Sequence, residues 1–202
     1  NVVVNENIKL KHYPDSCKSR GQYLPLLELS VKEEPNDDRN VHYLAREYYF
    51  YKMYDKAIKM FKRHISMQNS VWDEERASSF RYIAKCYIAK GNKTLPEKFY
   101  LKAIAEKPTI RENLYELAKF YYNNEKWEKA AATLLTMKNI KERKLTYMSD
   151  PDCWGSIPDD MLSICFYHLK NKKQAIKYCL LAIENNDCDR LKNNLKIFNE
   201  MP

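Results

Sequence analysis

The residues of this chain that most directly suggest chemistry are two carboxylates in one short segment. Asp150-Pro151-Asp152 has the Asp-x-Asp spacing that holds a divalent cation against a diphosphate when it stands at the end of a strand. Here the segment lies between two helical patterns and is followed by Trp154 and Gly155. A turn in which an aspartate caps the next helix explains this pattern better. We therefore expect no metal site in this chain.

Histidine, serine and cysteine do not form a recognisable catalytic group. The four histidines do not cluster in the sequence, and His64 takes a repeat position that usually holds a small residue, which favours packing between helices. No serine or cysteine has a histidine and an acid at a familiar spacing, and no glycine-rich phosphate loop is present. We expect this segment to be non-catalytic and to carry no cofactor of its own.

The cysteines indicate a reducing compartment. None of the six forms a Cys-x-x-Cys pair, and three lie within helical patterns, where cysteine behaves as a small apolar residue. The sequence has no signal peptide and no apolar run of about 18 residues, the length that indicates a membrane span. These features predict a cytoplasmic protein with reduced thiols and no transmembrane helix.

An array of helical repeats must position any functional residue of this chain. Only three glycines occur, which favours helices joined by short turns. Three segments align on a small residue flanked by large apolar ones, at Ala45, Ala84 and Ala118. From Ala84 to Ala118 the step is 34 residues, the period of the tetratricopeptide repeat (TPR), and from Ala45 to Ala84 it is 39. A fourth unit, aligned on Ser163, follows about eleven extra residues.

These patterns predict an all-α fold: a TPR-like superhelical array of antiparallel helix hairpins with a short N-terminal extended segment. We expect residues 1–22 to be the tail and linker of a catalytic domain upstream, because Ile8 to Leu10 alternates like a β-strand that has no sheet here. The rest, 23–202, is expected to be one repeat domain with a capping helix at each end. Its four repeats are predicted near 38–70, 77–108, 111–142 and 156–188.

The repeat register also predicts which side chains line a concave groove. Cations and tyrosines predominate at these positions, and both can hold a carboxylate, a phosphate or the face of a sugar ring. An ordinary solvated surface is the alternative, since any helical array carries lysine and arginine. The predicted groove residues are His42, Arg46, Tyr49, Arg81, Lys85, Tyr115, Lys119 and Tyr122, with Tyr167 and His168 in the fourth repeat.

Several segments are more specific than the generic repeat. They include His12 to Arg20, the insertion Asp73-Glu74-Glu75-Arg76, and the insertion Asp150 to Gly155 followed by Pro158-Asp159. Together they resemble the C-terminal repeat region of bacterial family 2 glycosyltransferases of the GT-A type, over nearly the whole chain. The resemblance implies a mixed α/β domain upstream, where a separate Asp-x-Asp motif would hold a nucleotide sugar and a divalent metal.

Two functions follow from these observations. The first is a non-catalytic scaffold of a glycosyltransferase that binds a protein, peptide or glycan acceptor, braces the catalytic domain or forms a homodimer. The alternative is a stand-alone TPR adaptor that holds an acidic peptide in its concave groove. The net charge of +8 does not by itself indicate nucleic acid, because no basic patch or nucleic-acid-binding motif accompanies it. We therefore expect no nucleic acid partner.

Overall fold

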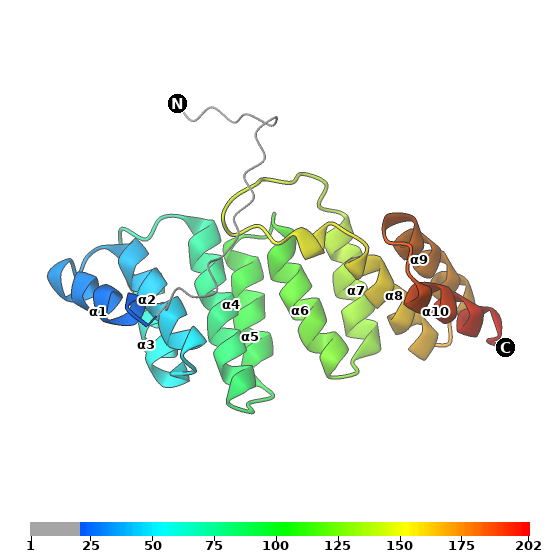
Figure 1. Ribbon diagram of the computed structural model, residues 1–202, viewed down its shortest axis with the longest axis horizontal. Helices are drawn as coiled ribbons and strands as arrows, with labels where there is room; N and C mark the ends of the chain where they lie inside the picture. Colours follow the sequence, from blue (N-terminus) through cyan, green and yellow to red (C-terminus); the bar gives the residue numbers. More distant parts are fainter. Residues whose placement is uncertain (1–20) are drawn as a thin grey trace.

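The computed structural model describes residues 21–202, which form ten α-helices and one short 3₁₀ helix arranged in a row (Figure 1). This part of the chain contains no β-strand. The predicted N-terminal extended segment lies outside the described residues. In chain order the elements are α1 (Tyr23–Glu33), α2 (Asp38–Phe50), α3 (Tyr54–Ser66), α4 (Asp73–Ala89), α5 (Leu95–Glu106), α6 (Arg111–Asn123), α7 (Trp127–Lys138), η1 (Pro151–Cys153), α8 (Ile157–His168), α9 (Lys172–Asn185) and α10 (Asp189–Asn199).

The helices pair into four antiparallel hairpins: α2 with α3, α4 with α5, α6 with α7, and α8 with α9. Helix α1 packs on α2 and helix α10 packs on α9, so each end of the stack is covered by a single helix. The predicted all-α, TPR-like array is confirmed. Besides this pairing, each hairpin packs against the next one, α3 on α4, α5 on α6 and α7 on α8, as in other repeat proteins.

The same backbone turn ends the first helix of every hairpin. One residue in each turn has a positive φ angle, and a backbone N–H just beyond it donates to a carbonyl five residues earlier at 2.8–2.9 Å. This is the Schellman arrangement that stops a helix. Only the second hairpin places a glycine at this strained position. The four residues are Lys52, Gly91, Glu125 and Lys170, at spacings of 39, 34 and 45 residues.

Small residues mark where paired helices approach each other. Ala45, Ala84, Ala118 and Ser163 on the first helices are each 0% exposed. Ala57, Ala130 and Ala175 occupy the matching positions on three of the second helices and are also fully buried. In the second hairpin Pro96 replaces that alanine, and α5 starts at Leu95, four residues after its turn rather than two as in the other hairpins. Proline is tolerated there because it lies in the first turn of α5.

The first helices of the hairpins lie on the inner side of the array. Helix α2 contacts α4, α4 contacts α6, and α6 contacts α8, whereas the second helices are farther apart along the row. A stack that brings one set of helices closer together curves toward that set. The surface of α2, α4 and α6 is therefore concave, and we call it the groove.

The Asp73–Arg76 insertion differs from the prediction, which placed the start of the second repeat near residue 77. The structure shows it as an additional turn of helix, because α4 begins at Asp73 and has 17 residues where α2 and α6 have 13. Three acidic residues fill this first turn, where negative charge is favoured by the helix dipole.

The residues between α7 and α8 form a long segment, 139–156, that we call the return loop. It runs from the end of α7 back over α6 to the start of α4, then returns through η1 to α8 (Figure 1). The loop therefore lies over the N-terminal ends of α4 and α6, on the rim of the groove. Asp150 caps η1, since its carboxylate accepts a hydrogen bond from the Asp152 backbone N–H at 3.0 Å, as the turn interpretation predicts.

We predict opposite stability effects for two lysine-to-glycine substitutions. Lys52→Gly removes the strain of a positive φ angle and should raise the free energy of unfolding by about 0.5–1 kcal/mol. Lys59→Gly, at an equally exposed position within α3, should lower it by about 1 kcal/mol, since glycine is a poor helix former. Urea denaturation followed by circular dichroism measures both. Equal changes in the two variants would contradict the turn assignment.

Candidate functional site

The groove contains a pocket of about 180 Å³ where three first helices meet the return loop. Helix α2 contributes Arg46, and α4 contributes Ser78, Arg81, Tyr82 and Lys85, which lie on one face of that helix because they are three or four residues apart. The remaining wall comes from Glu112 and Glu116 of α6 and from Tyr147, Met148 and Asp150 of the return loop. Three of the predicted groove residues therefore lie in one pocket.

Two of the groove lysines share one carboxylate. Glu116 Oε1 lies 3.1 Å from Lys85 Nζ and 2.9 Å from Lys119 Nζ. Burial would raise the pKa of Glu116, but the two ammonium groups outweigh it and hold the pKa below its usual value. Lys119 also lies over the Tyr115 ring, 4.5 Å from its centroid. Both lysines therefore have an ionic partner, although the single carboxylate offsets only one of their two positive charges.

The two arginines of the pocket differ in how they are held. Arg81 is buried, and its Nη1 donates to the Asn113 side-chain oxygen at 2.8 Å. Arg46 is flanked by aromatic rings, with its guanidinium carbon 6.0 Å from the Tyr43 centroid and 5.9 Å from the Tyr82 centroid. Stacking of this kind orients the guanidinium without using its N–H donors.

Three buried side-chain atoms of residues 21–202 have no hydrogen-bond partner, and two of them belong to this pocket. They are Arg46 Nε and Ser78 Oγ, while the third is His42 Nε2. Ser78 is only 1% exposed, so its hydroxyl is shielded from bulk solvent. Buried polar groups are nearly always hydrogen-bonded in folded proteins, which makes this pair of unused groups informative.

The return loop is held over the pocket by buried carboxylates of α4. Tyr147 donates its hydroxyl to Glu75 Oε1, and Thr146 donates to Glu74 Oε2 at 3.1 Å. Burial by itself would raise the pKa of Glu75, but hydrogen bonds from His64 and Tyr147 keep the pKa below its usual value, so the group is an anion. Burial, and then the hydrogen bond to Glu75, raise the pKa of Tyr147, which therefore stays protonated and donates.

Behind Glu75, a chain of buried polar groups crosses from α3 to α2. His64 Nε2 lies 3.5 Å from Glu75 Oε2, His64 Nδ1 lies 2.9 Å from Ser79 Oγ, and Ser79 Oγ lies 2.9 Å from His42 Nδ1. Because Glu75 can only accept, His64 Nε2 carries the hydrogen in its contact with Glu75. Burial lowers the pKa of His42 to about 3, so its imidazole is neutral.

These buried hydrogen bonds also account for a group of side chains that has the composition of a metal site. Ligand atoms of Asp38, His64 and Glu75 lie within 4.8 Å of one another, a grouping that occurs once in the part of the chain the structure describes. Both nitrogens of His64 already have partners, since Ser70 Oγ lies 3.0 Å from Nε2 in addition to Glu75. The prediction that His64 packs between helices agrees with its complete burial.

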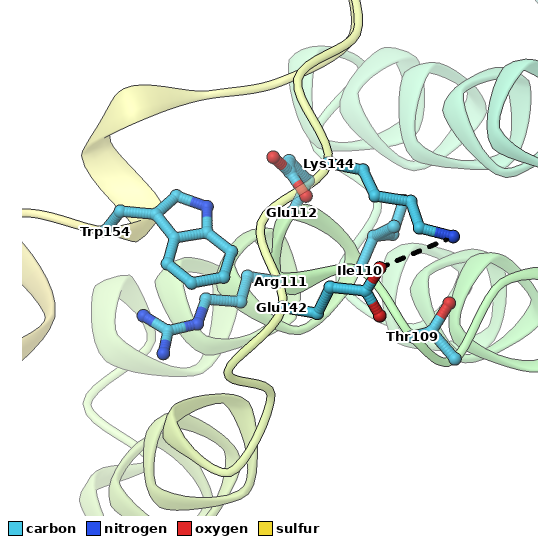
Figure 2. A pocket seen from close by; sticks show the side chains of 7 residues that line it. All are labelled: Thr109, Ile110, Arg111, Glu112, Glu142, Lys144 and Trp154. Carbon is cyan, nitrogen blue, oxygen red and sulfur yellow. Dashed lines mark ion pairs between the residues drawn. The ribbon is translucent and has the colours of Figure 1, made fainter.

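The other limb of the return loop is anchored beside a second, smaller pocket of about 100 Å³ (Figure 2). The Trp154 indole lies over Arg111, with the guanidinium carbon 3.7 Å from the ring centroid. Arg111 also donates to the carbonyl oxygen of Ile140 at 2.9 and 2.7 Å and to that of Cys153 at 3.1 Å. Since these loop contacts occupy the guanidinium, we interpret this pocket as a loop anchor rather than a ligand site.

The remaining predicted groove residues are not part of the larger pocket. His42 is 0% exposed and Tyr115 is 3% exposed. The prediction that both side chains line the groove is therefore wrong, because the structure places them in the interior. Tyr49 and Tyr122 are half-buried and pack edge-on against Tyr82 and Trp127, at centroid distances of 5.1 and 5.3 Å. The fourth-repeat residues Tyr167 and His168 lie outside the pocket, and His168 stacks on Trp127 at 4.0 Å.

Sequence reasoning missed Ser78 and the contribution of the return loop. Ser78 precedes Arg81 by three residues and Tyr82 by four, so helical spacing alone could have placed it on the predicted face. Tyr147 and Met148 have no such signal, because their position depends on contacts with residues about seventy positions earlier in the chain. No described helix has both the length and the apolar character required to cross a membrane.

Comparison with known proteins supports the fold. No protein family and no curated protein sequence matches the chain. The crystal structure of MamA aligns with a TM-score of 0.64 and 16% identity over 81% of this chain and 86% of MamA. YrrB, a TPR protein with an unusual peptide-binding site, aligns with a TM-score of 0.60 and 13% identity over 86% and 81%. The C-terminal part of a TPR repeat-containing protein from Cytophaga hutchinsonii aligns with a TM-score of 0.64 and 17% identity, over 88% of this chain and 67% of that protein's chain. These likenesses show that the chain has a TPR-like fold.

We predict opposite effects for two adjacent serine-to-alanine substitutions in α4. Ser78→Ala removes a buried hydroxyl that has no partner, and should raise the free energy of unfolding by about 1 kcal/mol. Ser79→Ala removes the hydroxyl that lies between two buried histidines, and should lower it by about 1–3 kcal/mol. Both serines are buried in the same helix, so each is the control for the other in thermal unfolding. Destabilisation by Ser78→Ala would show that its hydroxyl has a partner.

Proposed function

We propose that this chain is a non-catalytic binding scaffold whose groove holds an acidic segment of a partner protein. The observation that supports the proposal most directly is the pair of unused polar groups, Arg46 Nε and Ser78 Oγ, in the pocket on the concave side of the repeat array. Concave surfaces are where helical repeat proteins hold extended ligands. That the TPR protein YrrB has a peptide-binding site is consistent with this use of the fold.

The charge of the groove favours an acidic ligand. The whole chain has a net charge of +8, which attracts anions at long range. Within the groove Lys119 remains about one third exposed although it pairs with Glu116, so an approaching carboxylate can share its ammonium group. The half-buried rings of Tyr49, Tyr82 and Tyr122 offer flat apolar faces to the rest of such a segment. Free cysteines, four of them buried, support a reducing location such as the cytoplasm.

A displayed library of random linear peptides tests the scaffold function. We expect selection on the full chain to enrich peptides rich in aspartate and glutamate. Lys119→Glu, which reverses a groove charge outside the pocket, should weaken their binding about tenfold. Isothermal titration calorimetry of the enriched peptides measures the change.

The matched control is Lys98→Glu, which makes the same charge change at an exposed position of α5 outside the groove. It should leave the dissociation constant within about twofold, because exposed charges far apart are screened by salt. Equal weakening by both variants would indicate general charge attraction rather than a groove. Failure to enrich any peptide would refute the peptide-binding scaffold.

A second candidate function places this scaffold in a glycosyltransferase. The resemblance rests largely on two insertions, Asp73–Arg76 and Asp150–Gly155, and the structure provides a reason for their occurring together. The return loop that contains the second insertion binds Glu74 and Glu75 of the first, and the Asp150 backbone N–H donates to Glu112 at 3.0 Å. The Asp73–Arg76 segment is therefore linked to the Asp150–Gly155 segment through Thr146 and Tyr147, which precede the second segment in the return loop. In such an enzyme the groove would bind a protein or glycan acceptor, brace the catalytic domain or join two copies of the chain.

The coding sequence upstream of Asn1 tests the glycosyltransferase proposal. We expect it to encode an α/β domain with its own Asp-x-Asp motif, and the longer protein to transfer a sugar from a nucleotide sugar only when a divalent metal is added. Asp152→Asn within this chain is the control, and should leave transfer unchanged because Asp150 and Asp152 form a helix cap. A reading frame that starts near Asn1 would exclude this function and leave the scaffold function intact.

A further inference from the structure

We infer that a second groove, on the side of α4 that faces away from the concave surface, binds an acidic amphipathic helix of a partner protein. We call it the outer groove. It lies between α3 and α5, which both pack on α4, and has a volume of about 450 Å³. Its lining residues are Lys62, Ile65, Phe80, Ile83, Tyr87, Leu95, Lys98, Phe99 and Lys102. The inference goes beyond the proposed function, because it concerns a different surface and a different form of ligand.

The floor of the outer groove is an apolar stripe of α4. Phe80, Ile83 and Tyr87 are spaced at i, i+3 and i+7, so they lie on one face of the helix. At 3.6 residues per turn this face is opposite the one that carries Tyr82 and Lys85 in the concave groove. The two sites share no lining residue, so each can be tested without altering the other.

The walls of the outer groove carry positive charge only. Lys62 belongs to α3, Lys98 and Lys102 belong to α5, and no acidic residue lines the groove. Within residues 21–202 none of these three lysines makes an ion pair. Lys102 Nζ lies 5.8 Å from the Phe80 ring centroid and 5.6 Å from that of Phe99, so its charge is held over the apolar floor.

The acidic residues of the two wall helices do not offset these lysines. Each of them has a partner elsewhere: Asp55 pairs with Lys90, Glu106 pairs with Arg76, and Glu97 accepts a hydrogen bond from Tyr121. An anionic ligand is therefore the complement that the outer groove lacks.

An acidic amphipathic helix matches both the floor and the walls. Its apolar residues at i, i+3 and i+7 would face the α4 stripe, and acidic residues on its two flanks would meet the lysines of α3 and α5. Charged residues flank the apolar seam of a coiled coil in the same way.

Other occupants of the outer groove fit its charge or its shape less well. Residues 1–20 of this chain contain four basic and two acidic side chains, and a second copy of the chain has the same net charge of +8. Neither complements three lysines. A bilayer surface would meet the lysines, but Ile83 is 0% exposed at the bottom of the groove, where only an inserted side chain comes near it.

A pair of designed peptides tests the outer groove on the full chain. The probe has about 18 residues, enough to populate a helix, with leucines at i, i+3, i+7 and i+10 and glutamates on both flanks. The control peptide has the same composition, with its leucines spread around the helix. We expect the probe to bind about tenfold more tightly than the control in fluorescence anisotropy. Equal binding would overturn the inference, because charge alone would then account for it.

Charge reversal on each wall identifies the site. Lys62→Glu and Lys98→Glu should each weaken binding of the probe about tenfold, whereas Lys119→Glu in the concave groove should change it by less than about twofold. A second probe with lysines in place of the glutamates should bind the Lys62→Glu/Lys98→Glu double variant more tightly than the unchanged chain. Loss of affinity without this rescue would mean that the substitutions act on the fold, and would refute the outer groove.

The outcomes separate this inference from the proposed function. Ligands of the concave groove should depend on Lys119 and not on Lys98, and the probe should show the reverse. If the probe depends on Lys119, the outer groove is refuted and the scaffold function stands. If the probe depends on Lys62 and Lys98, and the library yields no ligand that depends on Lys119, the outer groove stands and the proposed function is refuted.

Vesicles of phosphatidylcholine and phosphatidylserine test the bilayer alternative. We expect no difference between Lys98→Glu and the unchanged chain in vesicle sedimentation. Vesicle binding that is lost in Lys98→Glu, together with no binding of the probe, would make this surface a membrane site and overturn the inference.

Discussion

The buried carboxylate of Glu75 is the interaction on which the shape of the groove depends. Glu75 is 2% exposed, and a buried charge persists only when neighbouring groups compensate for its lost hydration. His64 of α3 and Tyr147 of the return loop both provide that compensation, so one side chain of α4 links the first hairpin, the second hairpin and the loop. The additional turn at the start of α4 brings Glu75 to this position. Without it the return loop would lose its hydrogen bonds to Glu74 and Glu75 of α4.

Two buried serines of the second repeat differ in whether their hydroxyl groups have hydrogen-bond partners. Ser79 is fully used, because it lies between the imidazoles of His42 and His64. Ser78, its neighbour, is equally buried and unused. Natural proteins rarely leave such groups unpaired unless the site has a functional role. The difference between two adjacent serines therefore supports the proposed binding role of the groove side of α4.

Much of the fold could be predicted because repeats are a local signal. The 34-residue step, the small residues and the late start at Pro96 each depend on residues close in sequence. The helical register also placed Arg46, Arg81 and Lys85 together correctly. The helical register could not predict how deeply a side chain is buried, because burial depends on contacts with residues that are distant in sequence. His42 is buried because Ser79 of the next repeat packs against it, and Tyr115 because η1 of the return loop lies nearby.

The return loop changes how this array can select a ligand. An open TPR groove contacts an extended ligand along several repeats, so its specificity is distributed over many weak contacts. Here the loop encloses the centre of the groove, where the residues from α2, α4 and α6 meet Tyr147, Met148 and Asp150. A ligand must therefore either insert one group into the enclosed pocket or stay outside the centre of the groove. Under the proposed binding function, specificity would depend on the side chains that line this pocket, because a buried polar site rejects ligands that leave its donors unpaired. The segment that interrupts the repeat period would then be the element that makes the scaffold selective.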